Sequence, residues 1–154
     1  MKDPREIWAR TSVFVWPERY VLASLGLERL AEAAKVVASR RRGFCAVVVE
    51  HDEVSLTADD ETFRSSGLET SARVARHYRA ITLDCVVDLD TCGFLAPAAR
   101  RLADAGVSVV PQCAFLRDHL LVPDKDLDRA VGVLEEWIRV CRDEAPTPSE
   151  PGLH

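Results

Sequence analysis

The sequence lacks an apolar run long enough to cross a membrane. A membrane-spanning helix needs about 18 or more predominantly apolar residues, and no segment of the 154 residues has that character. The first ten residues, MKDPREIWAR, are charged and lack the apolar core of a secretory signal. These two absences predict a cytoplasmic protein.

Basic residues are not in excess either. The formal net charge is −5, whereas proteins that bind nucleic acid or anionic membranes need a basic face. We therefore expect no nucleic-acid partner and no membrane partner. One basic run, Arg40–Arg42, comes just before Gly43. We interpret it as the last turn of a helix, where positive charge suits the helix dipole.

The cysteines do not form a pattern typical of disulfides or metal sites. Their number, five, is odd and they are not closely paired, which favours reduced thiols. Cys92, Cys113 and His119 match no common zinc spacing, so no metal site is predicted. A Gly-rich phosphate loop is also missing, and we expect no cofactor.

Apolar residues make up 47% of the chain, enough to bury a core. Their periodicity predicts alternating strands and helices in the first half. The expected elements are a strand at 11–16 that turns at Pro17, a returning strand at 20–25, a helix at 28–42 stopped by Gly43, a hairpin of strands at 44–49 and 54–56, a loop at 57–67 and a short helix at 68–78.

The second half has a clearer pattern. We expect a strand at 81–87, a helix at 94–105, a strand from 107 that Pro111 limits or places at an edge, a return strand at 119–122 and a long helix after Asp124. This β-α-β-β-α order is most of a ferredoxin-like unit. Such a sheet needs four strands, and we predict that residues 11–16 supply the missing one.

These patterns predict an α+β fold with two ferredoxin-like βαββαβ units, antiparallel sheets and helices on one face. The expected organisation is a flexible arm at 1–10, a first unit at 11–65, a linker with a short helix at 66–79, a second unit at 80–142 and a Pro-rich disordered tail at 143–154.

Several short motifs of the second half occur together in a known family. They are GFLA at 93–96, LADAGVS at 102–108, CAFLRDHLLV at 113–122 and DLDRA at 126–130. Together they resemble the second ACT domain of short bacterial tandem-ACT proteins, which are similar to the cytosolic arginine sensors of eukaryotes and to the regulatory ends of aspartokinases. Residues 17–20 and 44–56 extend the resemblance more weakly to the first half, giving two ACT-like units.

The resemblance implies a regulatory protein that binds an amino acid or a related acid at an interface between ACT units, and a homodimer. Backbone N–H groups at a helix N-terminus suit a carboxylate, and nearby carboxylates suit an ammonium group. The implied ligand-binding residues are Asp88, Asp90, Thr91, Cys92 and Gly93 of the strand-to-helix loop, with Gln112, Cys113, Phe115, Arg117 and Asp118 of the facing hairpin.

Each of these positions also has a structural interpretation. Asp88 or Asp90 could cap the helix that follows, and Asp118 could be a turn residue. The hairpin also departs from the family pattern, because Cys113 and Ala114 replace two hydroxyl residues. Leu116 replaces an acidic residue of the family pattern, and Arg117 follows it. A basic ligand would lose its acidic partner and meet Arg117, which favours an anionic or neutral ligand.

Three functions remain open on the sequence. The first is a small ligand-binding regulatory protein. The second is an enzyme on the same scaffold that acts on an amino-acid-derived substrate, with Cys113, His119 and Asp118 as its catalytic group. The third is a structural or interaction protein whose ligand site has decayed.

Overall fold

The computed structural model describes residues 3–40 and 42–144. Its helices are α1 (Pro4–Arg10), α2 (Leu30–Ser39), α3 (Asp60–Ser65), α4 (Ala96–Asp104) and α5 (Leu127–Glu144). Its strands are β1 (Ser12–Leu25), β2 (Ala46–Val49), β3 (Val54–Asp59), β4 (Arg73–Asp84), β5 (Val110–Cys113) and β6 (Asp118–Pro123). Short 3-10 turns lie at Leu27–Arg29, Leu68–Ser71 and Asp124–Asp126. Most of the predicted tail, from residue 145 onward, lies outside the described residues.

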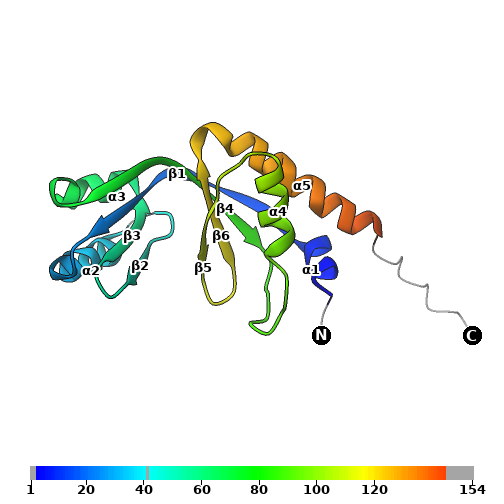
Figure 1. Cartoon of the computed structure of the whole chain (residues 1–154), viewed down its shortest axis with the longest axis horizontal. Coiled ribbons are helices and arrows are strands. Elements are labelled where there is room, and N and C mark those ends of the chain that lie inside the picture. The colour runs from blue at the N-terminus through cyan, green and yellow to red at the C-terminus, as the bar shows by residue number, and fades with distance from the viewer. Residues whose placement is uncertain (1–2, 41, 145–154) are drawn as a thin grey trace, which may run out of the picture.

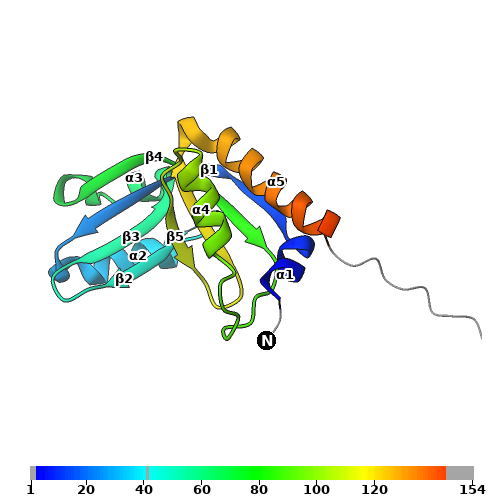
Figure 2. The same cartoon turned by 45° about the vertical axis from the view of Figure 1, so that its right-hand side comes forward.

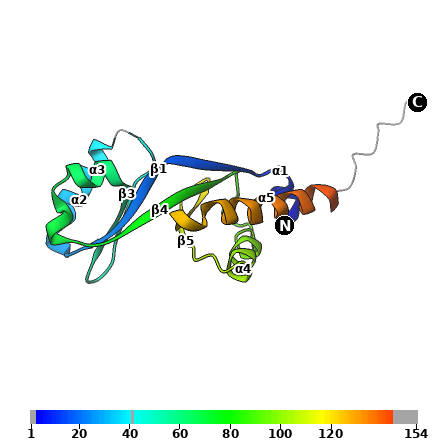
Figure 3. The same ribbon diagram turned by 90° about the horizontal axis from the view of Figure 1, so that it is seen from above.

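All six strands form one antiparallel sheet in the order β2-β3-β1-β4-β6-β5. The two long central strands, β1 and β4, run side by side through both halves of the molecule (Figures 1 and 3). Each half therefore has the four-strand order of a ferredoxin-like unit, β2-β3-β1-β4 in the first and β1-β4-β6-β5 in the second. The predicted α+β fold class is confirmed.

The N-terminal part of β1 completes the second half of the sheet, as the sequence predicted. Residues Ser12 to Val15 pair with Asp84 to Ile81 of β4. The predicted turn at Pro17 is wrong, because β1 continues through it as a single strand. The register shifts between Val15 and Arg19. Pro17 lies in this irregular stretch, where its missing N–H removes no ladder hydrogen bond.

Two other predictions between residues 57 and 78 are also wrong. The expected loop contains the end of β3 and helix α3, whose N-cap residue Asp59 accepts a hydrogen bond from the Thr62 N–H. The expected helix at 68–78 is a short 3-10 turn followed by β4. A second register shift in the β1–β4 ladder accompanies His77, whose φ of 66° is unusual for a residue with a side chain.

Residues 3–10 are not the loose arm that the sequence predicted. Asp3 caps α1 by accepting a hydrogen bond from the Arg5 N–H, and a proline stands in its first turn. Trp8 then anchors the helix, because its side chain is fully buried. Helix α2 ends earlier than predicted, at Ser39, so Arg40 and Arg42 follow the helix instead of forming its last turn.

The core has two helix-covered clusters and a smaller third one. Alternate residues of β1 face the helices of the two halves. They are Val13 and Val15 in the second half, and Val21, Ala23 and Leu25 in the first. Helices α2 and α3 lie at one end of the sheet, and α1, α4 and α5 lie at the other (Figures 1 and 2). Tyr20, Ala80 and Leu121 form the third cluster on the opposite face.

Within residues 3–40 and 42–144, no helix is both long enough and apolar enough to cross a membrane. All five cysteines are free thiols.

Candidate functional site

The candidate site is built on the loop between β4 and α4, residues 85–95. Phe94 fixes the end of this loop. Phe94 is 4% exposed, and its ring stacks on Trp8 of α1 with the ring centroids 4.8 Å apart. The Trp8 indole Nε1 also donates a 2.7 Å hydrogen bond to the Phe94 carbonyl. The N-terminal helix therefore holds the loop in place where α4 begins.

Gly93 gives this loop its turn. Its φ is +79°, in the left-handed region that residues with a Cβ avoid. A Cβ built on Gly93 would meet no atom within 4 Å. Backbone conformation, and not lack of space, is therefore what calls for glycine here.

The first turn of α4 faces the candidate site. Gly93, Phe94, Leu95 and Ala96 all line a pocket between this loop and the β5–β6 hairpin. The N-cap residue is Leu95, whose apolar side chain cannot accept a hydrogen bond, so neither Asp88 nor Asp90 occupies that position. The partial positive charge of a helix N-terminus is thus directed toward the pocket.

The hairpin of β5 and β6 supplies the facing wall. Cys113 and Asp118 are register partners at its end, and the Ala114 N–H donates a 2.8 Å hydrogen bond to the Arg117 carbonyl. The Arg117 Nε lies 2.8 Å from Oδ1 of Asp84, at the end of β4. A hydrogen bond within the hairpin tip and an ion pair to β4 therefore fix the position of the tip.

Loop and hairpin enclose a pocket of about 410 Å³. Seven of the ten predicted ligand-binding residues line it: Asp88, Thr91, Gly93, Cys113, Phe115, Arg117 and Asp118. The other three, Asp90, Cys92 and Gln112, are not part of its lining. Gln112 pairs with His119 in the ladder, so strand alternation directs its side chain to the other face of the sheet.

Asp118 sets the protonation state of its neighbour in the pocket. The Cys113 thiol hydrogen-bonds to the Asp118 carboxylate, and this bond together with burial raises the pKa of Cys113 to about 11. A thiolate beside a carboxylate would be repelled, so the proton stays on sulfur. Cys113 is therefore a hydrogen-bond donor at neutral pH and a poor nucleophile.

His119 does not join the predicted catalytic group. It lies on the opposite face of the sheet from Cys113 and Asp118, because adjacent strand residues point in opposite directions. Its Nδ1 is 2.7 Å from Oγ1 of Thr82, which also accepts a 2.7 Å hydrogen bond from the Trp16 indole. Burial lowers the pKa of His119. The thiol–imidazole pair that the enzyme hypothesis needs is thus not assembled.

Large apolar side chains surround the pocket mouth. Leu89 of the loop is 76% exposed, and Phe115 and Leu116 of the hairpin are 75% and 45% exposed. The sequence prediction missed the contribution of Leu89, and it also missed Trp8, which lies behind the loop. The Asp-Pro helix start at residues 3 and 4 was the available signal for the second of these.

The comparisons with known proteins agree with this architecture. Residues 73–136 match the family model of the ACT domain. An ACT domain is therefore found in the part of the chain that carries β4, α4, the β5–β6 hairpin and most of α5. No curated protein matches the chain in sequence.

Several solved structures share the fold. A protein from Agobacterium tumefaciens has 19% identity and a TM-score of 0.67, covering 82% of this chain and 88% of its own. A Vibrio cholerae protein described as a possible transport protein has 20% identity and a TM-score of 0.68, with coverages of 87% and 94%. The regulatory subunit of aspartate kinase from Thermus thermophilus has 12% identity and a TM-score of 0.63, with coverages of 80% and 95%. At these identities the likeness establishes the fold alone.

Proposed function

We propose that this protein is a small regulatory protein that binds an amino acid or a related acid in the pocket between the β4–α4 loop and the β5–β6 hairpin. The observation that supports this most directly is the arrangement of charge around the pocket. The N-terminus of α4 lies on one wall, where it suits a carboxylate. Asp118 lies on the other wall, where it suits an ammonium group. The ACT domain found at residues 73–136 supports the same ligand class.

The departures in the hairpin limit which acids fit. Leu116 lines the pocket together with Arg117, whose guanidinium is already paired with Asp84. A ligand with a cationic side chain would approach that guanidinium, so an anionic or neutral side chain is favoured.

The second part of the proposal is a homodimer in which a partner chain covers the pocket. Leu89, Phe115 and Leu116 expose apolar surface around the mouth of a pocket that is open to solvent, and such patches commonly mark interaction sites. A closed two-fold contact between identical chains would bury them. In this proposal residues 11–65 and 80–142 are two ACT-like units, and the location is cytoplasmic.

A thermal-shift screen of the twenty amino acids and related small acids tests the ligand class. A ligand that binds only the folded protein raises its melting temperature, and we expect at least one compound to do so at millimolar concentration. Asp118→Asn should abolish the shift. Asp104→Asn is the matched control, because Asp104 carries the same charge on the exposed surface of α4, where it pairs with Arg100.

Failure of every compound to raise the melting temperature would overturn the ligand proposal. A shift that survives Asp118→Asn would place binding elsewhere. Light scattering during size-exclusion chromatography tests the dimer separately. We expect a dimer mass for the wild-type chain and a monomer mass for Phe115→Glu.

A further inference from the structure

A second pocket lies in the first half of the molecule. It has a volume of about 590 Å³ and lies among the end of β3, helix α3 and the residues that follow α2. Carboxylate and hydroxyl side chains dominate its lining, which includes Glu18, Arg42, Asp59, Glu61, Ser65 and Ser66. None of these residues lines the pocket beside α4, so the two pockets are separate.

Asp59 is the central residue of this second pocket. Its side chain is only 5% exposed. Oδ1 accepts a 2.9 Å hydrogen bond from the Thr62 N–H and so caps α3. Oδ2 is buried and has no hydrogen-bond partner. A buried carboxylate oxygen without a partner destabilises the folded state. A ligand that donates a hydrogen bond to Asp59 Oδ2 would remove this cost.

Glu18 of β1 also has a buried carboxylate oxygen without a partner. This oxygen is Oε2, and Glu18 lines the same pocket. Glu18 and Asp59 both act on the buried Tyr20 hydroxyl, where burial first and the two carboxylates in addition raise the pKa of Tyr20. Two unsatisfied carboxylate oxygens are therefore close to the same hydroxyl group and line one cavity.

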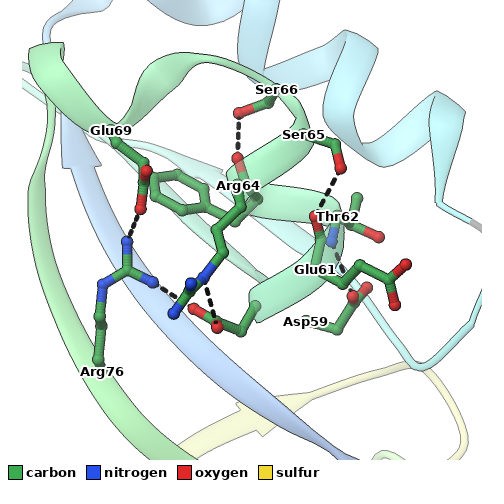
Figure 4. Close-up of polar contacts among 10 residues, drawn as sticks. Asp59, Glu61, Thr62, Arg64, Ser65, Ser66, Glu69 and Arg76 are labelled. Atoms are coloured by element: carbon green, nitrogen blue, oxygen red, sulfur yellow. Dashed lines mark hydrogen bonds and ion pairs between the residues drawn. The ribbon is translucent and has the colours of Figure 1, made fainter.

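Two arginines beside α3, Arg64 and Arg76, already pair with other carboxylates. Arg64 lies 2.8 Å from Asp60, and Arg76 pairs with both Asp60 and Glu69. Figure 4 shows these ion pairs on one side of α3, with Asp59 and Glu61 on the other. Among the ion pairs formed by residues 3–40 and 42–144, none includes Glu18, Asp59 or Glu61.

The chemistry of the lining favours an organic cation over a metal ion. The part of the chain that the structure describes contains no group of three or more acidic, histidine or cysteine side chains placed to hold a metal. Ammonium and guanidinium groups, in contrast, carry several N–H donors that two separate carboxylates and neighbouring hydroxyl groups can share. Ser65 and Ser66 supply such hydroxyl groups.

We propose that this pocket binds a small molecule through an ammonium or guanidinium group held between Glu18 and Asp59. The cation supplies the donors that Asp59 Oδ2 and Glu18 Oε2 lack. Glu61 adds negative charge to the same lining. Arg42, also in the lining, favours ligands whose positive charge is confined to one end, because a second cationic group would approach its guanidinium.

Amide chemical-shift titration of the full-length chain with butylammonium and with butylguanidinium tests the proposal. We expect saturable shifts at residues 59–66 and near Glu18. Butanol, which has the same chain without the charge, should leave these amides unchanged. Asp59→Asn retains an oxygen that can cap α3, so it should weaken binding without unfolding the protein. Loss of one charge-assisted contact predicts at least about tenfold weaker binding.

Glu18→Gln should weaken binding similarly and provides a second variant that does not touch the α3 cap. Glu69→Gln is the matched control, because Glu69 pairs with Arg76 outside the pocket. Absence of saturable shifts with either cation would overturn the proposal, as would equal shifts with butanol. Shifts with Mg²⁺ or Ca²⁺ in place of the organic cations would replace it with a metal site. Unchanged affinity in both Asp59→Asn and Glu18→Gln would remove these carboxylates from the site.

Discussion

The two halves of the sheet share one strand order but differ in the connection from first strand to first helix. In the second half this connection is the eleven-residue stretch 85–95, and in the first half it is the four-residue stretch 26–29, most of which is a 3-10 turn. The long connection leaves room for a pocket at the start of α4. The short one does not, and the first-half pocket lies instead beside α3 and the end of α2. In this molecule the longer connection therefore contributes to a pocket, as connecting loops on a rigid scaffold often do.

The two pockets also differ in how their charges are satisfied. Beside α4, Asp118 is bonded to the Cys113 thiol and Arg117 is paired with Asp84. Beside α3, Glu18 and Asp59 each keep a buried oxygen without a partner. A helix N-terminus offers hydrogen-bond donors and an unpaired carboxylate offers acceptors. In our proposals the pocket beside α4 takes a carboxylate together with an ammonium group, whereas the pocket beside α3 takes a cation alone.

Trp8→Ala should have the largest effect. Removing a fully buried tryptophan costs about 3–5 kcal/mol of unfolding free energy. Urea denaturation measures this loss. At temperatures where the variant is folded, amide shifts should change at residues 93–96 and stay close to wild type around Asp59. Trp8→Phe keeps an aromatic ring against Phe94 and should lose much less stability. A loss below about 1 kcal/mol for Trp8→Ala would show that α1 does not hold the loop.

Gly93→Ala and Gly132→Ala form the next comparison. Gly93 has a φ of +79°, where an L-residue is strained by roughly 1–2 kcal/mol. Gly132 lies on the exposed side of α5 with nothing within 4 Å of a built Cβ, so alanine there should stabilise by about 0.4–1 kcal/mol. Thermal or urea unfolding measures both. Equal effects of the two substitutions would contradict the conformational role of Gly93.

The protonation of Cys113 can be tested by alkylation. Its pKa of about 11 keeps the thiolate scarce at mildly alkaline pH. Asp118→Asn removes the neighbouring negative charge and should speed iodoacetamide modification of Cys113 by roughly tenfold, since the gain in thiolate fraction outweighs its lower nucleophilicity. Peptide mass spectrometry over a time course gives the rate, with the exposed Cys92 as an internal reference. An unchanged Cys113 rate would mean that Asp118 does not control the thiol.

His119→Gln should have the smallest effect, which is a change in how the free energy of unfolding depends on pH. Its folded-state pKa is lowered, mainly by burial, so the unfolded chain binds more protons in the window below its usual value of about 6.5. The contribution of neutral His119 to the free energy of unfolding is fully present above that value and is lost as pH falls toward the folded-state pKa. His119→Gln should flatten this loss in urea-unfolding measurements across the window. His51→Gln, at an exposed turn, should leave the wild-type slope unchanged.

The sequence was most informative where motifs lie close together along the chain. The loop from Asp88 to Gly93 and the segment from Gln112 to Asp118 were expected to face each other, and seven of the ten residues predicted there line one pocket. The predicted grouping of Cys113 with His119 failed because it depended on hairpin register, which decides the face on which each side chain lies.

Other features depend on contacts between distant segments. Trp8 reaches the Phe94 carbonyl across 86 residues of sequence, and Arg142 of α5 donates hydrogen bonds to the Ala9 and Thr11 carbonyls. A seven-residue helix too short to be stable alone therefore forms on distant contacts. Proline rarely continues a strand, so the sequence predicts a turn at Pro17, and the bulge that accommodates Pro17 is visible only in the paired sheet. The second pocket joins Glu18 to Asp59 in the same way, from two strands that are far apart in sequence.

An amide-shift titration with butyrate and with butylammonium compares the two pockets, since both probes are four-carbon chains that carry a single charge of opposite sign. We expect butyrate to shift the amides of residues 93–96 and 113–118 and to leave those of residues 59–66 unchanged, and we expect butylammonium to shift those of residues 59–66. Failure of one probe alone would remove one site and leave the other. Butyrate acting on residues 59–66, or neither probe acting on either pocket, would contradict the proposed difference between the pockets.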